Sequence, residues 1–159
     1  MANSGPPPNF DAVVIGAGFA GLGMLRRLRD ELGMSAQVYE AGGGVGGTWY
    51  WNRYPGARCD SESYIYCFSF SKELLQDWDW SGKYPEQPEI LSYLNHVADR
   101  FDLRRNIQFN TRVTSARFLE DSNRWEIEPD QGDRVTAQFL ITGIGCISAC
   151  NVPDIKGLH

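Results

Sequence analysis

The fold is decided by the stretch DAVVIGAGFAGLGMLRRLRDELGMSAQVYE, residues 11–40. Its first five residues, 11–15, are a short apolar run that is followed by glycine, which predicts a buried strand. Leucines then recur at helical spacing over 19–32 with charged residues between them, which predicts an amphipathic helix. The apolar segment 36–39 predicts a second strand. Strand, helix and strand in this order predict a βαβ unit, and therefore an α/β fold with a parallel sheet.

The turn between the predicted strand and helix carries a glycine fingerprint. Gly16, Gly18 and Gly21 form the pattern G-x-G-x-x-G in the context that dinucleotide binding requires. They permit, in turn, a tight turn, close approach of the backbone to a pyrophosphate, and close packing of helix on strand. Glu40 follows the second strand, where a carboxylate binds both hydroxyls of an adenosine ribose and repels a 2′-phosphate. The fingerprint disfavours NADP at this position and leaves FAD, NAD and a glycine-rich turn without a ligand as alternatives.

A second glycine cluster, GGGVGG at 42–47, follows the ribose-binding acid directly. An NAD-binding fold requires no glycines there. In FAD-binding proteins the chain passes close to the flavin side of the pyrophosphate, and glycines permit that approach. The second cluster therefore favours FAD.

The composition argues against several classes of function. The net charge of −5 and the pI of about 5.0 argue against a nucleic-acid partner. No apolar run is long enough to span a bilayer, and the N-terminus lacks the features of a secretory signal, so we expect a cytoplasmic protein with no membrane partner. The four cysteines contain no CxxC pair, which predicts reduced thiols and no metal site, with a redox pair of the last two as the alternative: Cys59, Cys67, Cys146 and Cys150.

The remaining sequence predicts a single domain. Segment 41–87 is rich in glycine, proline and aromatic residues, which is typical of a long functional loop. Residues 88–101 predict a helix with Pro88 in its first turn and one apolar stripe. We expect residues 1–10 to be a flexible proline-rich lead-in, and 11–159 to be an FAD-binding domain with a parallel sheet, a helix layer and a small antiparallel β-meander. Further strands are predicted at 107–110, 112–119, 124–128 and 134–142.

Residues 46–60, GGTWYWNRYPGARCD, resemble a known family. They are similar to the signature G-G-x-W-x4-[FY]-P-[GM]-x3-D of class B flavin monooxygenases of the Baeyer–Villiger type. The segments YCFSFS (66–71), WDWSGKY (78–84) and QPEILSYLNHVADRFDLR (87–104) strengthen the resemblance, which covers residues 11–158. The chain is most similar to the members that oxidise phenylacetone, steroids and cyclic ketones.

The resemblance implies an FAD site and an NADPH contact. Arg58, Cys59 and Asp60 are implied to contact NADPH. Asp60 is implied to be catalytic, because the family's aspartate helps to orient a catalytic arginine beside the flavin. The residues implied to bind FAD run from its pyrophosphate, ribose and adenine (through the backbone of Val113) to its flavin: Gly16, Gly18, Phe19, Gly21, Glu40, Val113, Gly47, Thr48, Trp49, Tyr50, Trp51, Tyr66, Thr142 and Gly143.

These residues also have ordinary structural alternatives. The aromatic run 49–51 is typical of a core as well as of a cofactor site. Arg53 and Arg58 are compatible with a surface pair. Asp60 is compatible with a helix cap or a turn.

The reaction that the resemblance implies is the NADPH- and O2-dependent conversion of ketones to esters or lactones through a C4a-peroxyflavin. The sequence contains no second G-x-G-x-x-G, no F-x-G-x3-H-T-x2-W fingerprint and no counterpart of the family's arginine that faces the flavin. We therefore expect an FAD-binding portion that is catalytically incomplete, truncated before the NADPH-binding domain, with a sheet that lacks its last strand. The alternatives are the FAD domain of an N-hydroxylating flavin monooxygenase and a non-catalytic remnant that binds FAD.

Overall fold

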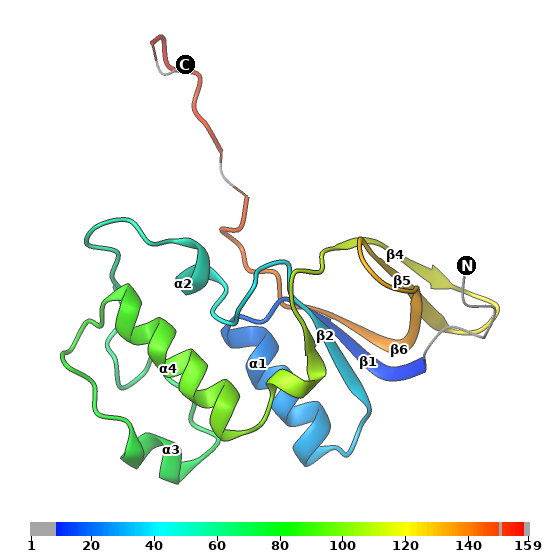
Figure 1. Cartoon of the computed structure of the whole chain (residues 1–159), viewed down its shortest axis with the longest axis horizontal. Coiled ribbons are helices and arrows are strands. Elements are labelled where there is room, and N and C mark those ends of the chain that lie inside the picture. The colour runs from blue at the N-terminus through cyan, green and yellow to red at the C-terminus, as the bar shows by residue number, and fades with distance from the viewer. Residues whose placement is uncertain (1–8, 150, 158–159) are drawn as a thin grey trace.

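The computed structural model describes residues 9–149 and 151–157. Figure 1 shows the helices gathered at one side of the molecule and the β4–β5 hairpin at the other. In chain order the elements are β1 (Asn9–Ile15), α1 (Phe19–Arg26), the π-helix η1 (Arg27–Glu31), β2 (Ala36–Tyr39), α2 (Thr48–Trp51), α3 (Lys72–Asp77), α4 (Gln87–Arg100), the 3-10 helix η2 (Arg104–Asn106), β3 (Ile107–Gln108), β4 (Val113–Leu119), β5 (Arg124–Pro129) and β6 (Val135–Thr142).

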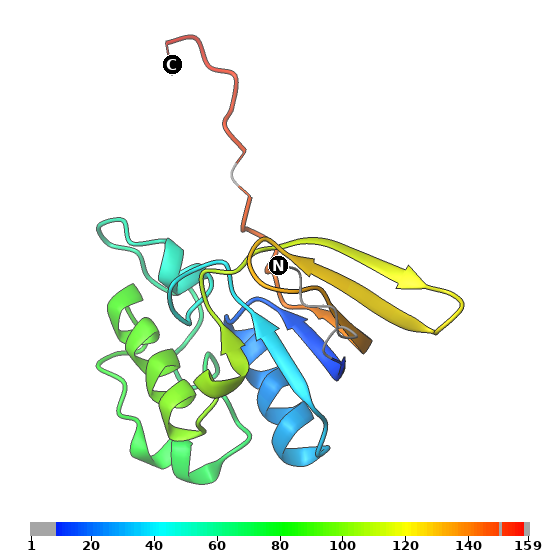
Figure 2. The same cartoon turned by 45° about the vertical axis from the view of Figure 1, so that its right-hand side comes forward.

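The six strands form one sheet in the order β3-β2-β1-β6-β5-β4. β3, β2, β1 and β6 are parallel neighbours, whereas β5 pairs antiparallel with both β6 and β4. Ile15 is aligned with both Tyr39 and Thr142, so the carboxyl ends of β2, β1 and β6 meet at one edge (Figure 2). The predicted α/β Rossmann-like fold with an antiparallel meander is confirmed. Open sheets of this kind bind ligands at the carboxyl edge where the strand order reverses, which here lies between β1 and β6.

Alternate residues of β1 supply two separate cores, because successive side chains of a strand point to opposite faces. Ala12 and Val14 belong to the larger core, which also contains residues of α1 and α4. Val13 packs on the opposite face with Tyr39 and with Ile127 of β5. All three β1 side chains are fully buried, which confirms the predicted buried strand.

Helix α4 carries the apolar stripe that its sequence predicts. The helix runs one residue earlier than the predicted range 88–101, and Pro88 occupies its first turn, where a missing N–H costs nothing. Its buried apolar residues face the larger core and are Ile90, Tyr93, Leu94, Val97 and Ala98.

Two elements end earlier than predicted. The helix predicted over 19–32 is α-helical only to Arg26 and continues as the wider π-helical turn η1. The strand predicted over 107–110 ends at Gln108. Asn110 has a positive φ of 52°, which turns the chain out of the strand.

Two other segments also differ from their predicted ranges. β1 begins at Asn9, so the predicted lead-in 1–10 overlaps the sheet by two residues, while residues 1–8 lie outside the described part of the chain. The irregular segment 41–87 contains the short helices α2 and α3. These helices have four and six residues, too few for a recognisable helical period.

The predicted lack of a last strand concerns the side of β6 that faces β5. β5 pairs with β6 only from Val135 to Ala137, and no strand in the described ranges pairs with the rest of β6 on that side. The absence of a last strand remains a prediction.

Cys59, Cys67 and Cys146 carry free thiols. Cys150 lies outside the described residues, so the alternative of a redox pair is not tested. Across 9–149 and 151–157, no helix has the length and apolar character needed to cross a bilayer.

Arg29 ties η1 to the end of α4, and its loss is expected to destabilise the fold. Its guanidinium donates to the carbonyls of Phe101 at 2.6 Å and Asp102 at 2.7 Å, where the helix dipole favours a cation. Arg29→Met keeps an aliphatic stem and removes both charge-assisted bonds, so we expect about 2 kcal/mol less free energy of unfolding in urea. Arg27→Met, at an exposed neighbouring position, is the control. Equal unfolding midpoints for the two variants would contradict this role.

Candidate cofactor site

The glycine fingerprint lies at the carboxyl edge of the sheet, where three glycines pack against one another. A Cβ on Gly21 would overlap the carbonyl oxygen of Gly16, and a Cβ on Gly16 would lie 2.7 Å from the carbonyl oxygen of Gly143. The amide of Gly143 donates to Ile15 of β1 at 2.8 Å. Helix α1 therefore lies directly on the ends of β1 and β6, as predicted for Gly21.

The second glycine cluster packs on the first, backbone against backbone. Gly47 has a φ of 54°, and a Cβ there would lie 2.9 Å from the Cα of Gly18. The amide of Gly46 donates to the carbonyl of Ala17 at 3.0 Å. The glycines of 42–47 thus have a role in loop packing in addition to the cofactor approach that the sequence suggests.

Glu40 joins the two glycine loops through its carboxylate. One oxygen accepts from the amide of Ala17 at 2.6 Å and the other from the amide of Gly42 at 2.7 Å, and the residue is 5% exposed. A carboxylate has about four lone pairs, so two remain for further donors. The donor roles of Ala17 and Gly42 could not be predicted from the sequence, because every residue type except proline carries the same backbone N–H.

The amino end of α1 is open to an anion. Gly18 is its N-cap, and no side chain accepts from its first-turn amides. Such unpaired amides, together with the positive end of the helix dipole, favour phosphate groups. With the Glu40 carboxylate close by, this donor and acceptor set fits the adenosine and pyrophosphate of a dinucleotide.

An aromatic group continues from the amino end of α1. The ring of Phe19 lies 4.8 Å from that of Tyr66 in an edge-on arrangement. The indole N–H of Trp49 donates to the Tyr66 hydroxyl at 3.0 Å. Burial raises the pKa of Tyr66, and the nearby Asp60 carboxylate adds to this shift, while the hydrogen bond from Trp49 opposes it.

Tyr50 and Trp51 take different positions from Trp49. The Tyr50 hydroxyl accepts from the amide of Gly43 at 3.1 Å, and the Arg53 guanidinium lies 4.8 Å from its ring centre. Trp51 is 60% exposed. Tyr50 therefore stabilises the second glycine loop, whereas Trp49 is buried and bonded to Tyr66.

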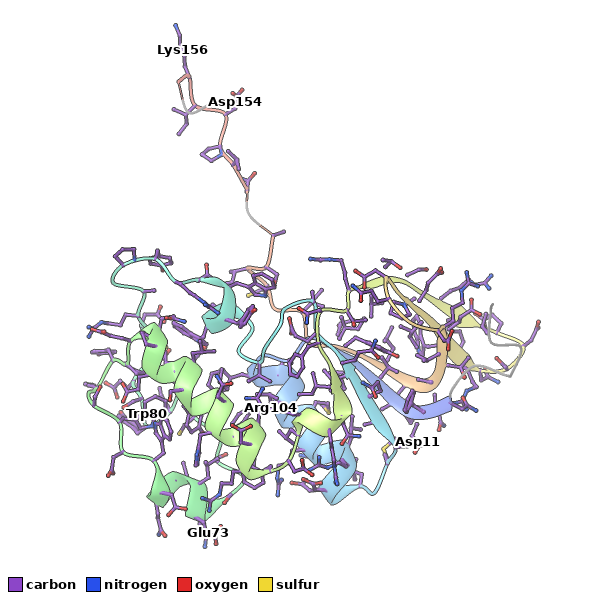
Figure 3. All side chains as sticks on the ribbon, in the orientation of Figure 1. Asp11, Glu73, Trp80, Arg104, Asp154 and Lys156 are labelled. Atoms are coloured by element: carbon purple, nitrogen blue, oxygen red, sulfur yellow. The ribbon has the colours of Figure 1, made fainter. Side chains whose placement is uncertain are left out.

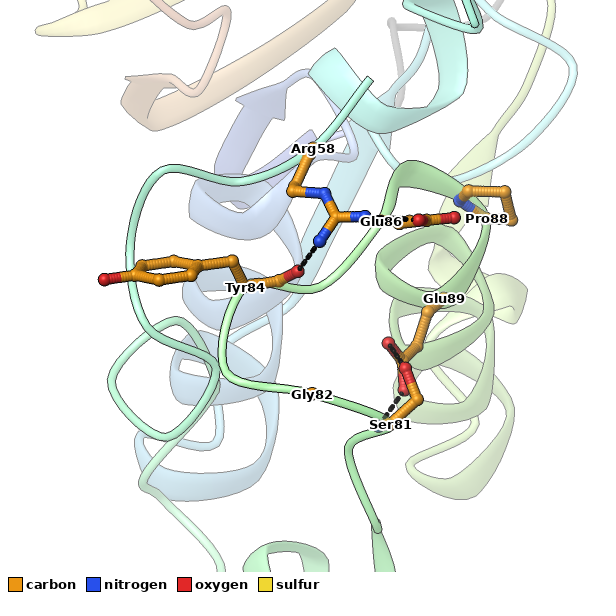
Figure 4. A pocket seen from close by; sticks show the side chains of 7 residues that line it. All are labelled: Arg58, Ser81, Gly82, Tyr84, Glu86, Pro88 and Glu89. Carbon is orange, nitrogen blue, oxygen red and sulfur yellow. Dashed lines mark hydrogen bonds and ion pairs between the residues drawn. The ribbon is translucent and has the colours of Figure 1, made fainter. Parts of the chain in front are cut away.

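The segment that carries Arg58, Cys59 and Asp60 is held by a second stretch of chain. Arg58 forms an ion pair with Glu86 and donates to the carbonyl of Tyr84 at 3.2 Å, beside an open pocket of about 360 Å³ (Figure 4). Cys59 is buried, and its sulfur accepts from a backbone amide two residues later. The Asp60 carboxylate is exposed and lies near Tyr66.

Val113 and Thr142 occupy strand ends. Val113 opens β4 and packs against the smaller core, on the opposite face of the sheet from α1. Thr142 ends β6 opposite Ile15, directly before Gly143. Thr142 therefore lies at the carboxyl edge beside the glycine fingerprint, whereas the predicted adenine contact of the Val113 backbone remains a prediction.

Figure 3 shows all the placed side chains, with Trp80 labelled beside α4. The ring of Trp80 lies 5.0 Å from that of Tyr93 and packs, half-buried, against the larger core.

Tyr93 gives this core a pH dependence. Its hydroxyl accepts from the amide of Phe68 at 2.8 Å, and burial raises the pKa of Tyr93 to about 12. As pH rises, the Tyr93 hydroxyl therefore ionises at a lower pH in the unfolded chain than in the folded one. Its contribution to the free energy of unfolding is complete below about pH 10 and decreases as pH rises toward 12. We expect the midpoint of thermal unfolding, followed by circular dichroism, to fall over this range, and less steeply in Tyr93→Phe. The exposed Tyr54→Phe should keep the wild-type slope; a parallel slope in Tyr93→Phe would contradict the assignment.

The chain is similar to known proteins along nearly its whole length. The family described as NAD(P)-binding Rossmann-like domain matches residues 14–79. The Baeyer–Villiger monooxygenase of Pseudooceanicola batsensis is 52% identical over 150 residues, which cover 94% of this chain and 28% of that protein. Nearly the whole chain is therefore similar to a part of Baeyer–Villiger monooxygenases. Two other relatives are similar over most of the chain. The cyclohexanone 1,2-monooxygenase of Acinetobacter sp is 48% identical, and the match covers 95% of this chain and 28% of that protein. The phenazine N-monooxygenase of Lysobacter antibioticus is 47% identical, and the match covers 94% of this chain and 28% of that protein.

The solved structures of relatives agree with this placement. The structure of OTEMO in complex with FAD and NADP matches with a TM-score of 0.86 at 48% identity, covering 96% of this chain and 29% of that one. The predicted family resemblance is confirmed, and homologues of the chain bind FAD and NADP. The chain spans about 28% of the length of the curated relatives it matches.

Proposed function

We propose that this chain binds FAD and forms the FAD-binding part of an NADPH- and O2-dependent Baeyer–Villiger monooxygenase that converts ketones to esters or lactones. The observation that carries the proposal is the buried Glu40 carboxylate near the uncapped amino end of α1. A carboxylate for a ribose and a helix N-terminus for phosphates are the two contacts that dinucleotide recognition requires in a βαβ unit. The relatives that carry FAD and NADP support the choice of cofactors. The cytoplasmic location is part of the proposal.

The chain offers a matching group for each part of FAD. Glu40 has lone pairs left for the ribose hydroxyls. The first-turn amides of α1 suit the pyrophosphate. The buried Trp49, with the half-buried Tyr66 bonded to it, suits a position that excludes water from the flavin. When bound, FAD supplies the transfer of electrons from NADPH to O2. The work of the chain is to bind, orient and shield it.

Arg58 and Asp60 are the residues that we assign to NADPH. Both are exposed on the segment next to Tyr66. Arg58 carries the positive charge that suits the phosphates of NADPH, and Asp60 carries the negative charge that suits a cationic partner near the flavin. A ketone substrate follows from the family, in which one relative is a cyclohexanone 1,2-monooxygenase.

A second candidate is the FAD-binding part of an N-hydroxylating monooxygenase. The observation that favours it is the 47% identity to a phenazine N-monooxygenase. Product analysis separates the candidates in a longer protein that contains this chain. Lactone from cyclohexanone supports the first, and an N-oxide from phenazine without lactone supports the second.

The test of the cofactor assignment is a titration of the purified chain with FAD. We expect flavin fluorescence to be quenched at a one-to-one ratio and flavin to stay with the chain on desalting. We also expect no bleaching by NADPH, because the second glycine fingerprint does not occur in the sequence. A chain that releases all flavin contradicts the proposed function, and rapid bleaching contradicts the expectation that it is catalytically incomplete.

A further inference from the structure

We propose that Gln87 is a positioning residue that holds the segment 49–57 in place beside the cofactor site. Gln87 is the first residue of α4 and is 7% exposed, although it is polar and lies next to the exposed Glu86. Burial of an amide is unfavourable unless its hydrogen bonds are satisfied. Both the side-chain amide and the backbone amide of Gln87 have hydrogen-bond partners.

The side chain of Gln87 binds α2, a helix that is too short to supply hydrogen-bond donors to all of its own carbonyls. In α2 the Thr48 carbonyl accepts from the amide of Asn52 at 3.0 Å, but a one-turn helix contains no further residues that could supply amides to the carbonyls that follow. In α2 a side-chain N–H group donates to each of three successive carbonyls. The pairs are Asn52 Nδ2 with Thr48 O (2.9 Å), Arg53 Nε with Tyr50 O (2.8 Å), and Gln87 Nε2 with Trp49 O. The first two donors are near neighbours in sequence, whereas Gln87 lies 38 residues from Trp49.

The backbone of Gln87 binds the other end of the same segment. Its amide donates to the carbonyl of Ala57 at 2.9 Å. Next to this contact, the amide of Cys59 donates to the carbonyl of Pro85 at 3.0 Å, and residue 58 forms a β-bridge with residue 86. Gln87 thus holds Trp49 with its side chain and Ala57 with its backbone.

The two anchored ends lead to the residues assigned to the flavin and NADPH. Trp49 is bound to Tyr66, and Tyr66 lies near Asp60. Arg58 follows Ala57 directly and lies at the junction drawn in Figure 4. Loss of the Gln87 side-chain bond would free Trp49 and leave a buried carbonyl without a partner. The positions of the aromatic pair and of the NADPH segment therefore depend on Gln87.

The first test is amide hydrogen exchange of the cofactor-free chain, which does not depend on the proposed function. Gln87→Met has a similar length and no donor, and Gln76→Met on the exposed side of α3 is the matched control. We expect peptides within 48–60 to exchange about tenfold faster in Gln87→Met, with no change in β4 and β5. Unchanged exchange in 48–60, or equal acceleration throughout the sheet, would overturn the proposal.

The second test is the affinity for FAD and the visible circular dichroism of the bound flavin; this consequence of the inference rests on the proposed function. We expect about tenfold weaker binding and an altered flavin spectrum in Gln87→Met only. Gln87→Glu, which keeps the size and turns an oxygen toward the Trp49 carbonyl, should show the same changes if the methionine variant fails to fold. Faster exchange with unchanged FAD affinity and spectrum would reduce Gln87 to a structural role. A wild-type chain that binds no FAD would contradict the proposed function alone, because exchange still tests the positioning of 49–57.

Discussion

Gly21→Ala is expected to lower the free energy of unfolding by about 4 kcal/mol or more, which is enough to unfold many domains. A Cβ at Gly21 would occupy the space of the Gly16 carbonyl oxygen. Both groups belong to rigid backbone, in a turn that also packs on Gly143, so no side chain can move aside. The measurement is chemical unfolding followed by circular dichroism, together with FAD retention, which we expect to be lost.

Gly82→Ala is the matched control for this substitution. Gly82 has open space around its Cα and lies in an exposed loop, so the same added methyl group meets nothing. We expect its unfolding midpoint to stay within about 0.5 kcal/mol of the wild type. A Gly21→Ala chain as stable as Gly82→Ala would show that helix α1 does not lie on the first turn as described.

Glu40→Gln is expected to weaken FAD binding about a hundredfold and to lower the free energy of unfolding by about 2–3 kcal/mol. Each carboxylate oxygen accepts from a backbone amide, of Ala17 and of Gly42. The amide side chain replaces one of these oxygens with an NH2 group, which turns a donor toward a donor and leaves one buried amide unpaired. The same change removes the charge that binds the ribose. Isothermal titration with FAD and urea unfolding measure the two effects separately.

Glu120→Gln, at an exposed position after β4, makes the same chemical change away from the site. Its affinity and stability should match those of the wild type. An FAD affinity of Glu40→Gln equal to that of Glu120→Gln would remove the central support for the cofactor assignment, while a loss of stability alone would restrict Glu40 to joining the two loops.

Much of the architecture could be predicted because it depends on local pattern. The βαβ unit, the stripe of α4 and the strands of the meander follow from apolar periods of 3.6 and 2 residues. The π-helical turn at Arg27–Glu31 and the early end of β3 were missed. Both depend on local backbone conformation that residue type specifies only weakly, as the positive φ of Asn110 illustrates.

The sequence predicted which residues belong to the candidate site better than it predicted the contacts among them. Glu40 and the glycines were identified by residue type and spacing, but the amides that bind the carboxylate were not. Trp49 and Tyr50 are neighbours of the same chemical kind, yet one is buried beside Tyr66 and the other braces the glycine loop. Nothing in residue type separates them, because the helical turn of α2 points their side chains in different directions.

By itself, the sequence determined the βαβ unit, the dinucleotide fingerprint and the resemblance to Baeyer–Villiger monooxygenases. Periodicity, glycine spacing and the run RYPGARCD are properties of residues close together in sequence, so they can be recognised before the fold is known. Only the tertiary structure decided that Glu40 joins the two glycine loops and that Gln87 holds α2. It also decided that Gly18 and Gly47 pack together, which is possible because neither residue carries a Cβ. The physical reason is separation along the chain. The contacts of Glu40 with Ala17, of Gly18 with Gly47 and of Gln87 with Trp49 connect residues 23 or more positions apart, which only the packed sheet and helices bring together.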